Sequence, residues 1–172
     1  MNQTMLRTAT AADAEAIHAL VTAHAAEGRL LPRQVDEVRR RAARFVVSEE
    51  NGLIHACAEL APLSRSVAEV RSLVVAAPFR QAGLAGRLVQ ALREQAVALG
   101  FETLTAFAHD ARFFVRQGFS LVPRLWVPEK IATDCHTCPL FLHCEQYAMV
   151  LPLTASARRG SADVPGRRIA VA

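Results

Sequence analysis

The stretch VAEVRSLVVAAPFRQAGLAGRLVQAL, residues 67–92, combines a strand, a glycine turn and the start of a helix. Residues 67–75 are rich in β-branched side chains, which favour a strand. Apolar residues recur at helical spacing from Leu84 onward, directly after Gly83. A turn that enters a helix in this way leaves the N–H groups of residues 83–86 without helical partners and directs them at one point. Such a point would hold a phosphate group without a lysine.

The spacing of the glycines excludes two common phosphate-binding motifs. Gly83 and Gly86 match neither the GxGxxG pattern of dinucleotide-binding proteins nor the Gly-Lys-Ser/Thr ending of a P-loop. Two explanations stay open at this point. The turn is either a backbone cradle for a phosphorylated ligand or a simple bend that leads into an ordinary helix.

The segments on both sides of this stretch predict a mixed α/β domain. Asn51-Gly52 separates two β-rich runs, which is the strongest short hairpin signal. Together with residues 67–75, the hairpin gives three consecutive strands in an antiparallel meander. The pattern elsewhere predicts a strand at 5–8, a helix from Thr10 to Gly28, a helix opened by Pro32, a helix from Leu84 to Gly100, a strand at 103–107, a short helix at 110–117, a strand at 119–123 and a last strand at 147–153.

Length and composition predict one folded domain. The chain has 172 residues, of which 52% are hydrophobic and 21% charged, as in an ordinary globular protein. It has neither a signal-peptide pattern nor an apolar run of the roughly 18 residues that a membrane span needs, so we expect a cytoplasmic protein without membrane contact. We expect the domain at residues 1–153 and a flexible tail at 154–172, which has no periodicity.

The charge of the chain indicates the kind of ligand that it attracts. The formal net charge is +4, and a weak positive field favours anionic ligands such as a nucleotide cofactor or a dicarboxylate. The basic residues are not interleaved with aromatic ones as on a nucleic-acid surface. We therefore expect a small-molecule ligand and no nucleic acid.

The glycine turn resembles the acyl-CoA binding motif of the GNAT superfamily of N-acetyltransferases, Arg/Gln-x-x-Gly-x-Gly/Ala, with Arg80, Gly83 and Ala85 at the specified places. This resemblance implies acetyl-CoA as cosubstrate. It also implies the α/β (α+β) GNAT fold, a central, mixed but mostly antiparallel twisted sheet flanked by helices. Further, it implies that a backbone N–H near Val74 or Val75 binds the thioester carbonyl and that the glycine turn cradles the pyrophosphate. The implied cofactor-binding residues are Leu73, Val74, Val75, Arg80, Gln81, Ala82, Gly83, Leu84, Ala85 and Gly86.

Three further stretches are similar to short, stand-alone N-acetylglutamate synthases. They are EGRLLPRQVDEVRRRAARFVV at 27–47, AEVRSLVV at 68–75 and VPEKIATDCHTCPLFLHCEQYAMVL at 127–151. This similarity implies transfer of acetyl from acetyl-CoA to the α-amino group of L-glutamate, the first step of arginine biosynthesis. A related amino acid is the alternative acceptor.

Glu69 is the candidate general base of such a transfer. Period-two alternation sends Glu69, Arg71, Leu73 and Val75 to one face of their strand, so a carboxylate and a guanidinium point the same way. A carboxylate with a pKa near 4 needs a water relay or a raised pKa to take an ammonium proton. The alternative is that Glu69 and Arg71 form a surface ion pair without a catalytic role.

The general acid that many superfamily members use is missing from its usual place. These members carry a tyrosine four residues before the Gly-Phe of a late strand, and here Phe114 stands at that distance from Gly118-Phe119. Tyr147, the one tyrosine of the chain, is the candidate substitute. A core or interface role is the alternative for Tyr147.

Arginine forks suit a substrate with two carboxylates, because they pair bidentately with each of them. By resemblance, Arg33 matches the carboxylate-binding arginine of the synthases, and Arg71 is placed to meet the other end of the substrate. Lys130 is the third candidate. An Arg-Lys-Ser of the larger synthases is absent here, and CEQY at 144–147 stands in that region.

Three of the four cysteines lie close together in the sequence. Cys135, Cys138 and Cys144, together with His143, could form a structural Cys3His zinc site. Reduced thiols that pack a loop are the alternative.

Two other functions fit the same cofactor motif. One is acetylation of another amino acid, a polyamine or a protein amine. The other is a non-catalytic acyl-CoA sensor or scaffold module, for which the missing tyrosine is the main support. A homodimer is one oligomeric state that the sequence leaves open.

Overall fold

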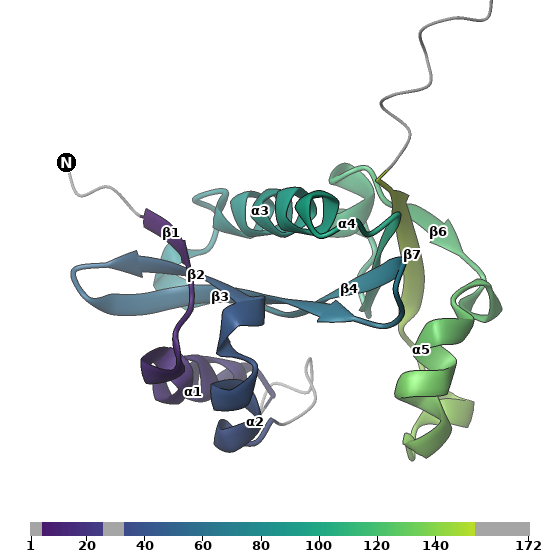
Figure 1. The fold of residues 1–172 in the computed structure, drawn as a ribbon, viewed down its shortest axis with the longest axis horizontal. Helices are drawn as coiled ribbons and strands as arrows, with labels where there is room; N and C mark the ends of the chain where they lie inside the picture. Colours follow the sequence, from purple (N-terminus) through teal and green to yellow (C-terminus); the bar gives the residue numbers. More distant parts are fainter. Residues whose placement is uncertain (1–4, 26–32, 154–172) are drawn as a thin grey trace, which may run out of the picture.

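The computed structural model describes residues 5–25 and 33–153. Within these residues a seven-stranded sheet has the order β1-β2-β3-β4-β5-β7-β6, and helices cover both of its faces (Figure 1). This mixed sheet flanked by helices confirms the predicted fold class. The predicted tail at 154–172 and the predicted end of the first helix at Gly28 lie outside the described residues.

The N-terminal half of the sheet is an antiparallel meander, as predicted. β1 (Met5–Thr8) pairs with β2 (Phe45–Glu50), β2 with β3 (Leu53–Pro62), and β3 with β4 (Val67–Val75). Asn51 and Gly52 join β2 to β3 with φ values of 53° and 77°. Both central residues of a tight hairpin turn need positive φ, which Asn and Gly adopt most readily.

The C-terminal half of the sheet starts with a parallel pair. β5 (Thr103–Ala108) runs parallel to β4, because α3 (Leu84–Ala98) carries the chain back across the sheet between them. The last strand, β7 (Tyr147–Pro152), lies between β5 and β6 (Ser120–Val122) and is antiparallel to both.

The helices form layers above and below the sheet. In Figure 1, α3 and α4 (Arg112–Arg116) cover one face, while α1 (Ala14–Ala25) and α2 (Val35–Arg40) cover the other. α5 (Pro128–Thr133) lies beyond β4 on the same side as α1 and α2. Short 3-10 turns complete the described elements: η1 (Ala11–Asp13), η2 (Ala42–Arg44), η3 (Ala77–Phe79), η4 (Arg124–Trp126), η5 (Cys135–Thr137) and η6 (Phe141–His143).

Each helical layer has its own apolar core. Beneath α3, the buried side chains of Leu88 and Leu92 pack with strand residues such as Leu104 and Met149. On the other face a smaller cluster joins α1 and α2 to the sheet, with Ile17, Val21, Val38, Phe45, Val47, Cys57 and Val74 as members. The sheet therefore has an α3 face and an α1/α2 face.

Replacing Leu88 by Ala tests the α3 core. Leu88 is fully buried, whereas Leu99 at the end of the same helix is largely exposed. We expect Leu88→Ala to lower the free energy of unfolding by about 2–5 kcal/mol, because it removes buried contacts and leaves a cavity. Leu99→Ala, the matched control, should change it by less than about 0.5 kcal/mol. Urea denaturation measures both, and equal effects would contradict the packing described.

Candidate active site

β4 and β5 separate in the middle of the sheet. Their parallel pairing runs from Val67–Thr103 to Val70–Ala106 and ends there in the described residues. β5 goes on pairing with β7 as far as Ala108, while residues 71–75 of β4 keep only β3 as a paired neighbour. The two strands therefore leave a wedge between them, with β4 backbone groups on one side.

A β-bulge in β4 lies at the start of this wedge. The register between β3 and β4 shifts between Cys57 and Glu59, so that β4 carries one residue more than β3 between these pairs. Ser72 lies in the extra segment with φ of 48°, a value that a non-glycine residue adopts only at a special position.

The bulge changes which side chains share a face. Leu73 and Val75 pack with the α3 core, whereas Val74 packs with the α1/α2 core. The prediction that Glu69, Arg71, Leu73 and Val75 share one face is therefore wrong after Arg71. An extra residue shifts the period-two alternation by one, and only the strand pairing reveals it.

The bulge and the end of the β4–β5 pairing together leave the N–H of Val75 on the edge of β4 that faces the wedge. The N–H of Ala76 donates to the carbonyl of His55 on β3 at 2.8 Å. Because successive N–H groups of a strand point to opposite edges, the N–H of Val75 points away from β3 and into the wedge. A donor in this place can bind a carbonyl oxygen that becomes negatively charged.

The glycine turn leads from this wedge into α3. Gln81 and Gly83 have φ values of 72° and 73°, and Gly83 is the N-terminal cap of α3. A Cβ at Gly83 would meet nothing within 4 Å, so the conformation of the turn, not lack of space, favours glycine there. Gly83 and Gly86 line a hollow of about 490 Å³ next to Leu6 of β1.

Arg80 connects the turn with two other elements. Its Nε donates to the carbonyl of Val75 at 3.1 Å, and its Nη2 lies 2.8 Å from His24 Nε2 at the end of α1. The other predicted cofactor residues of the turn are exposed or form the first turn of α3: Gln81, Ala82, Leu84, Ala85 and Gly86. The structure thus brings Val75, Arg80 and the start of α3 together around the wedge.

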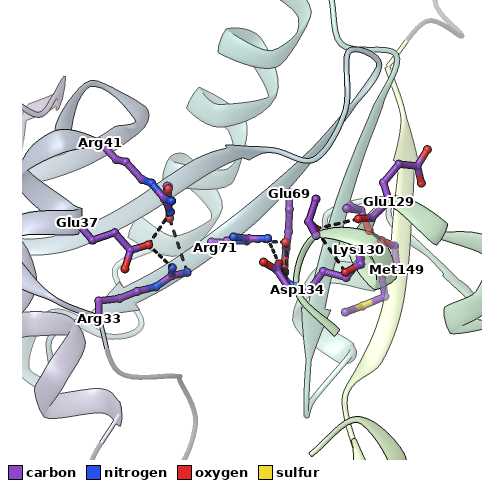
Figure 2. Close-up of polar contacts among 12 residues, drawn as sticks. Arg33, Glu37, Arg41, Glu69, Arg71, Glu129, Lys130, Asp134 and Met149 are labelled. Atoms are coloured by element: carbon purple, nitrogen blue, oxygen red, sulfur yellow. Dashed lines mark hydrogen bonds and ion pairs between the residues drawn. The ribbon is translucent and has the colours of Figure 1, made fainter. Parts of the chain in front are cut away.

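A second cluster lies on the α1/α2 face, where Glu69 is only 3% exposed. Lys130 Nζ donates to both carboxylate oxygens of Glu69 at 2.9 Å, and Arg71 Nε donates to Glu69 Oε2 at 2.6 Å (Figure 2). Asp134 accepts from Lys130 at 2.9 Å and also from Arg71. The predicted surface ion pair is therefore a partly buried network of four charged side chains.

A third cluster comes from the segment around α2. Arg33 Nη1 donates to Glu37 Oε1 at 3.0 Å, and Arg41 donates to the same oxygen (Figure 2). His18 of α1 holds this segment, since its Nε2 lies 3.0 Å from the carbonyl of Arg33. In Figure 2, Arg71 lies between this cluster and the network around Lys130.

Glu59 of β3 connects the two clusters. It is the cross-strand partner of Arg71, and its Oε2 lies 3.9 Å from Arg33 Nη2. Burial raises the pKa of the Glu59 carboxyl, although the positive charges of Arg33 and Arg71 partly oppose this. The structure thus places all three predicted substrate-binding cations, Arg33, Arg71 and Lys130, along one face.

Sequence reasoning missed Glu59, Glu37, Arg41 and Asp134. A signal for Glu59 exists, because it is the single charged residue in the strand run LIHACAELA at 53–61. A charge at an inward-facing position of such a strand is rarely left without a partner. Glu37, Arg41 and Asp134 have no comparable signal, since charged residues on short helices are normally solvated.

Tyr147 does not join these clusters. It begins β7 opposite Ala108 and is 52% exposed. By alternation it shares the face of Met149 and Leu151, which pack in the α3 core, and so it lies on the opposite face from Glu69. Phe114, at the usual tyrosine position, is buried edge-to-face against Phe119.

The predicted zinc site has no support from the structure. Among the described residues, which include all three clustered cysteines, no group of three or more potential ligands comes together. Arg124 holds this loop instead, because it donates to the carbonyls of Phe141 and Cys144 at 3.1 and 3.3 Å. The four cysteines are free thiols, and burial raises the pKa of Cys135.

The family comparison agrees with this geometry. The model of the acetyltransferase (GNAT) family matches residues 11–119. The chain is 31% identical over 150 residues to an N-acetyltransferase of Chlorobaculum tepidum, which covers 87% of this chain and 97% of that protein. A strand pair that opens next to a glycine turn and a helix N-terminus suits a CoA-dependent acyltransferase, the class to which the matching model and this relative belong. The chain belongs to the acetyltransferase (GNAT) family.

Other relatives have names that specify the class of acceptor. The amino-acid acetyltransferase of Azotobacter vinelandii is 33% identical over 116 residues, which is 66% of this chain and 27% of that protein. The chain thus spans about a quarter of the length of that relative.

Two solved structures share the fold at 22% identity. N-acetylglutamate synthase from Neisseria gonorrhoeae, complexed with coenzyme A and N-acetyl-glutamate, has a TM-score of 0.79 and covers 89% of this chain and 36% of that one. A Mycobacterium tuberculosis protein in complex with CoA has a TM-score of 0.72 and covers 86% and 98%. In the described part of this chain, no helix is long and apolar enough to cross a membrane.

Removing Lys130 tests the network around Glu69. Lys130→Met leaves the buried Glu69 with fewer donors, so we expect the free energy of unfolding to fall by about 1–3 kcal/mol. Arg112→Met is the matched control, because Arg112 pairs with Asp110 in full exposure and such pairs contribute little. Chemical denaturation at neutral pH measures both variants. A Lys130→Met protein as stable as the control would show that the network does not support the fold.

Proposed function

We propose that this protein transfers acetyl from acetyl-CoA to the α-amino group of L-glutamate. The observation that carries the proposal is the position of the acceptor cations. Arg33, Arg71 and Lys130 lie along one face of the sheet, next to the wedge where the Val75 N–H is directed. The names of the amino-acid acetyltransferase and N-acetylglutamate synthase relatives support the same acceptor class.

The cofactor would bind along the wedge and the glycine turn. Gln81 and Gly83 adopt positive φ in the turn that leads into α3. The N–H groups at the start of α3 converge at the helix N-terminus, where they suit a pyrophosphate. The thioester carbonyl would then reach the N–H of Val75. Arg80 donates to the carbonyl of Val75 in the structure. On cofactor binding it would either keep this hydrogen bond or donate to a phosphate of the cofactor instead.

The reaction proceeds by direct attack. The neutral α-amine forms a C–N bond with the thioester carbon, the oxyanion binds the Val75 N–H, and the C–S bond breaks to release the CoA thiolate. The proton that the attacking nitrogen loses passes through water to Glu69, whose oxygens also accept from Lys130 and Arg71, and Glu69 then returns this proton to solvent. A thiol pKa of about 8.5 lets the thiolate leave without a dedicated acid and then take a proton from water.

The acceptor would exchange partners with residues of the site. Each cation already pairs with a carboxylate of the protein: Arg33 with Glu37, and Arg71 and Lys130 with Glu69 and Asp134. A substrate carboxylate of the same geometry can replace Asp134 or Glu37, because both are less buried than Glu69.

One observation favours a second candidate function. The cations and carboxylates of the site are equal in number, so a neutral amino acid would enter without changing the net charge. The acceptor would then carry an uncharged side chain in place of the second carboxylate.

A different observation fits a non-catalytic acyl-CoA sensor. Phe114 stands where many family members carry the tyrosine that acts as general acid.

Thiol release from acetyl-CoA tests the acceptor. With a panel of amino acids, we expect release that depends on L-glutamate and exceeds release with glutamine, lysine or polyamines. Preferred release with a different amine would reject glutamate and keep acetyl transfer. Binding of acetyl-CoA without release with any amine would reject catalysis in favour of a sensor.

Glu69→Gln tests the general base. An amide cannot take the ammonium proton, so we expect kcat to fall on the order of 100-fold or more while acetyl-CoA binding is kept. Glu102→Gln is the control, since Glu102 is an exposed carboxylate before β5, at the end of this strand that stays paired with β4. Steady-state kinetics between pH 6 and 9 measures the effect, and an unchanged kcat would leave Glu69 a structural role only.

Arg33→Ala tests the acceptor arginine. We expect KM for L-glutamate to rise about tenfold or more, because a charge-assisted hydrogen bond is lost, while the KM for acetyl-CoA stays the same. Arg39→Ala on α2 is the matched control, since in the described part of the chain Arg39 pairs with Glu15 and Asp36, two exposed carboxylates. A loss of acetyl-CoA binding in Arg33→Ala would move Arg33 from the acceptor to the cofactor.

A further inference from the structure

Glu59 is a buried carboxylate that the proposed reaction does not use. Its residue is 1% exposed, and its Oε1 has no hydrogen-bond partner among the described residues. In the part of the chain that the structure describes, its Oε2 lies 3.9 Å from Arg33 Nη2, which is too long for a hydrogen bond. An ionised carboxylate in such surroundings is costly, because Oε1 does not regain the hydrogen bonds that water gave it.

Charged groups from several elements face Glu59. Arg33 lies before α2, Arg41 and the exposed Arg44 follow it, and Arg71 is the neighbour on β4. The anionic side chains nearby are Glu37, bonded to Arg33, and Glu69, bonded to Arg71, while the thiol of Cys57 is on the same strand. Burial raises the pKa of Glu59, and the positive charges oppose this, so its charge depends on what else occupies the arginines.

The charge balance of the acceptor face depends on Glu59. The ion-paired cations of this face are Arg33, Arg41, Arg71 and Lys130, and the carboxylates are Glu37, Glu59, Glu69 and Asp134. Among the described residues, this ion-paired set is neutral when Glu59 is ionised and carries one positive charge when Glu59 is protonated. A dicarboxylate amino acid has a net charge of −1 and matches the second state.

Glu59 and a substrate carboxylate also compete for the same partners. Glu59 lies between Arg33 and Arg71, the two guanidiniums that would bind the ends of the acceptor. A second carboxylate brought between them would repel an ionised Glu59 in a site shielded from water. A protonated Glu59 has no such repulsion, and its hydroxyl can donate a hydrogen bond.

We propose that Glu59 is a specificity-determining residue of the acceptor site, protonated when the site holds a dicarboxylate and ionised when it holds an acceptor with one carboxylate. This proposal rests on the proposed function, since it concerns the same acceptor site. The proton comes from solvent on binding and returns to solvent on release. Glu59 is a positioning residue, because it acts through the two arginines and does not touch the reacting atoms.

Proton uptake on binding of glutarate gives the first test. Glutarate carries two carboxylates and no amine, so no amine ionisation enters the measurement. Titration calorimetry of the CoA-saturated protein, in buffers of different ionisation enthalpy, counts the protons taken up. Above the pKa of Glu59 we expect uptake approaching one proton and an affinity that falls about tenfold per pH unit. Glutaramate, with one carboxylate replaced by an amide, should bind without uptake.

Glu59→Gln gives the second test, since it imitates the protonated carboxyl. We expect this variant to bind glutarate without proton uptake and with a flat pH profile, and to lower KM for L-glutamate at high pH with kcat unchanged. Glu102→Gln, an exposed carboxylate before β5, should keep the wild-type profile. If the glutamine variant folds poorly, Glu59→Met repeats the test with another uncharged side chain. The proton uptake of the wild-type protein tests the proposal without any variant.

The outcomes separate the two proposals. Glutarate binding without proton uptake, or the same pH profile in Glu59→Gln as in the wild type, overturns the role of Glu59 and leaves glutamate as acceptor. Failure of glutarate to bind and of glutamate to be acetylated at any pH, in a protein that still binds CoA, overturns the glutamate acceptor and with it the role of Glu59. Proton uptake on glutarate binding that is lost in Glu59→Gln supports both the role of Glu59 and the dicarboxylate acceptor.

Discussion

The extra residue in β4 is the constraint on which the site depends. Ser72 adopts positive φ, the register with β3 shifts, and the pairing with β5 ends at Val70. In a regular strand, Leu73 and Val75 would continue the polar face that Glu69 and Arg71 begin. The bulge sends them to the α3 core instead, so that the proposed acceptor-binding groups lie on one face and the wedge proposed for the cofactor opens between β4 and β5.

Charge pairing organises the acceptor face in the same region. Side chains from α2, β3, β4 and α5 meet there, and each cation has a carboxylate near it. Partly buried charges need such partners, because an unpaired one would destabilise the fold. In the proposed function, the same pairing lets a carboxylate of the acceptor replace a carboxylate of the protein.

Local sequence features predicted most of the fold, and pairing between distant strands accounts for what they missed. Asn51-Gly52 identified the hairpin, and the stretch at 67–92 identified strand, turn and helix, since these signals lie within a few residues. The bulge has no such signal, because Ser72 is an ordinary residue in a β-rich run. Arg33 was found by resemblance, Arg71 by strand alternation and Lys130 as a third candidate. Glu59 had a weak signal as the single charge of its strand run, whereas Asp134 became visible only in the network with Arg71 and Lys130.

The place of β7 in the sheet affects the order in which the protein can fold. β7 is the last described strand in the sequence, yet it pairs with both β5 and β6. Until it is synthesised, the edges of β5 and β6 have no partner, and β6 is not part of the sheet at all. A ribosome-bound chain therefore presents open strand edges over a half-built core, a state prone to aggregation.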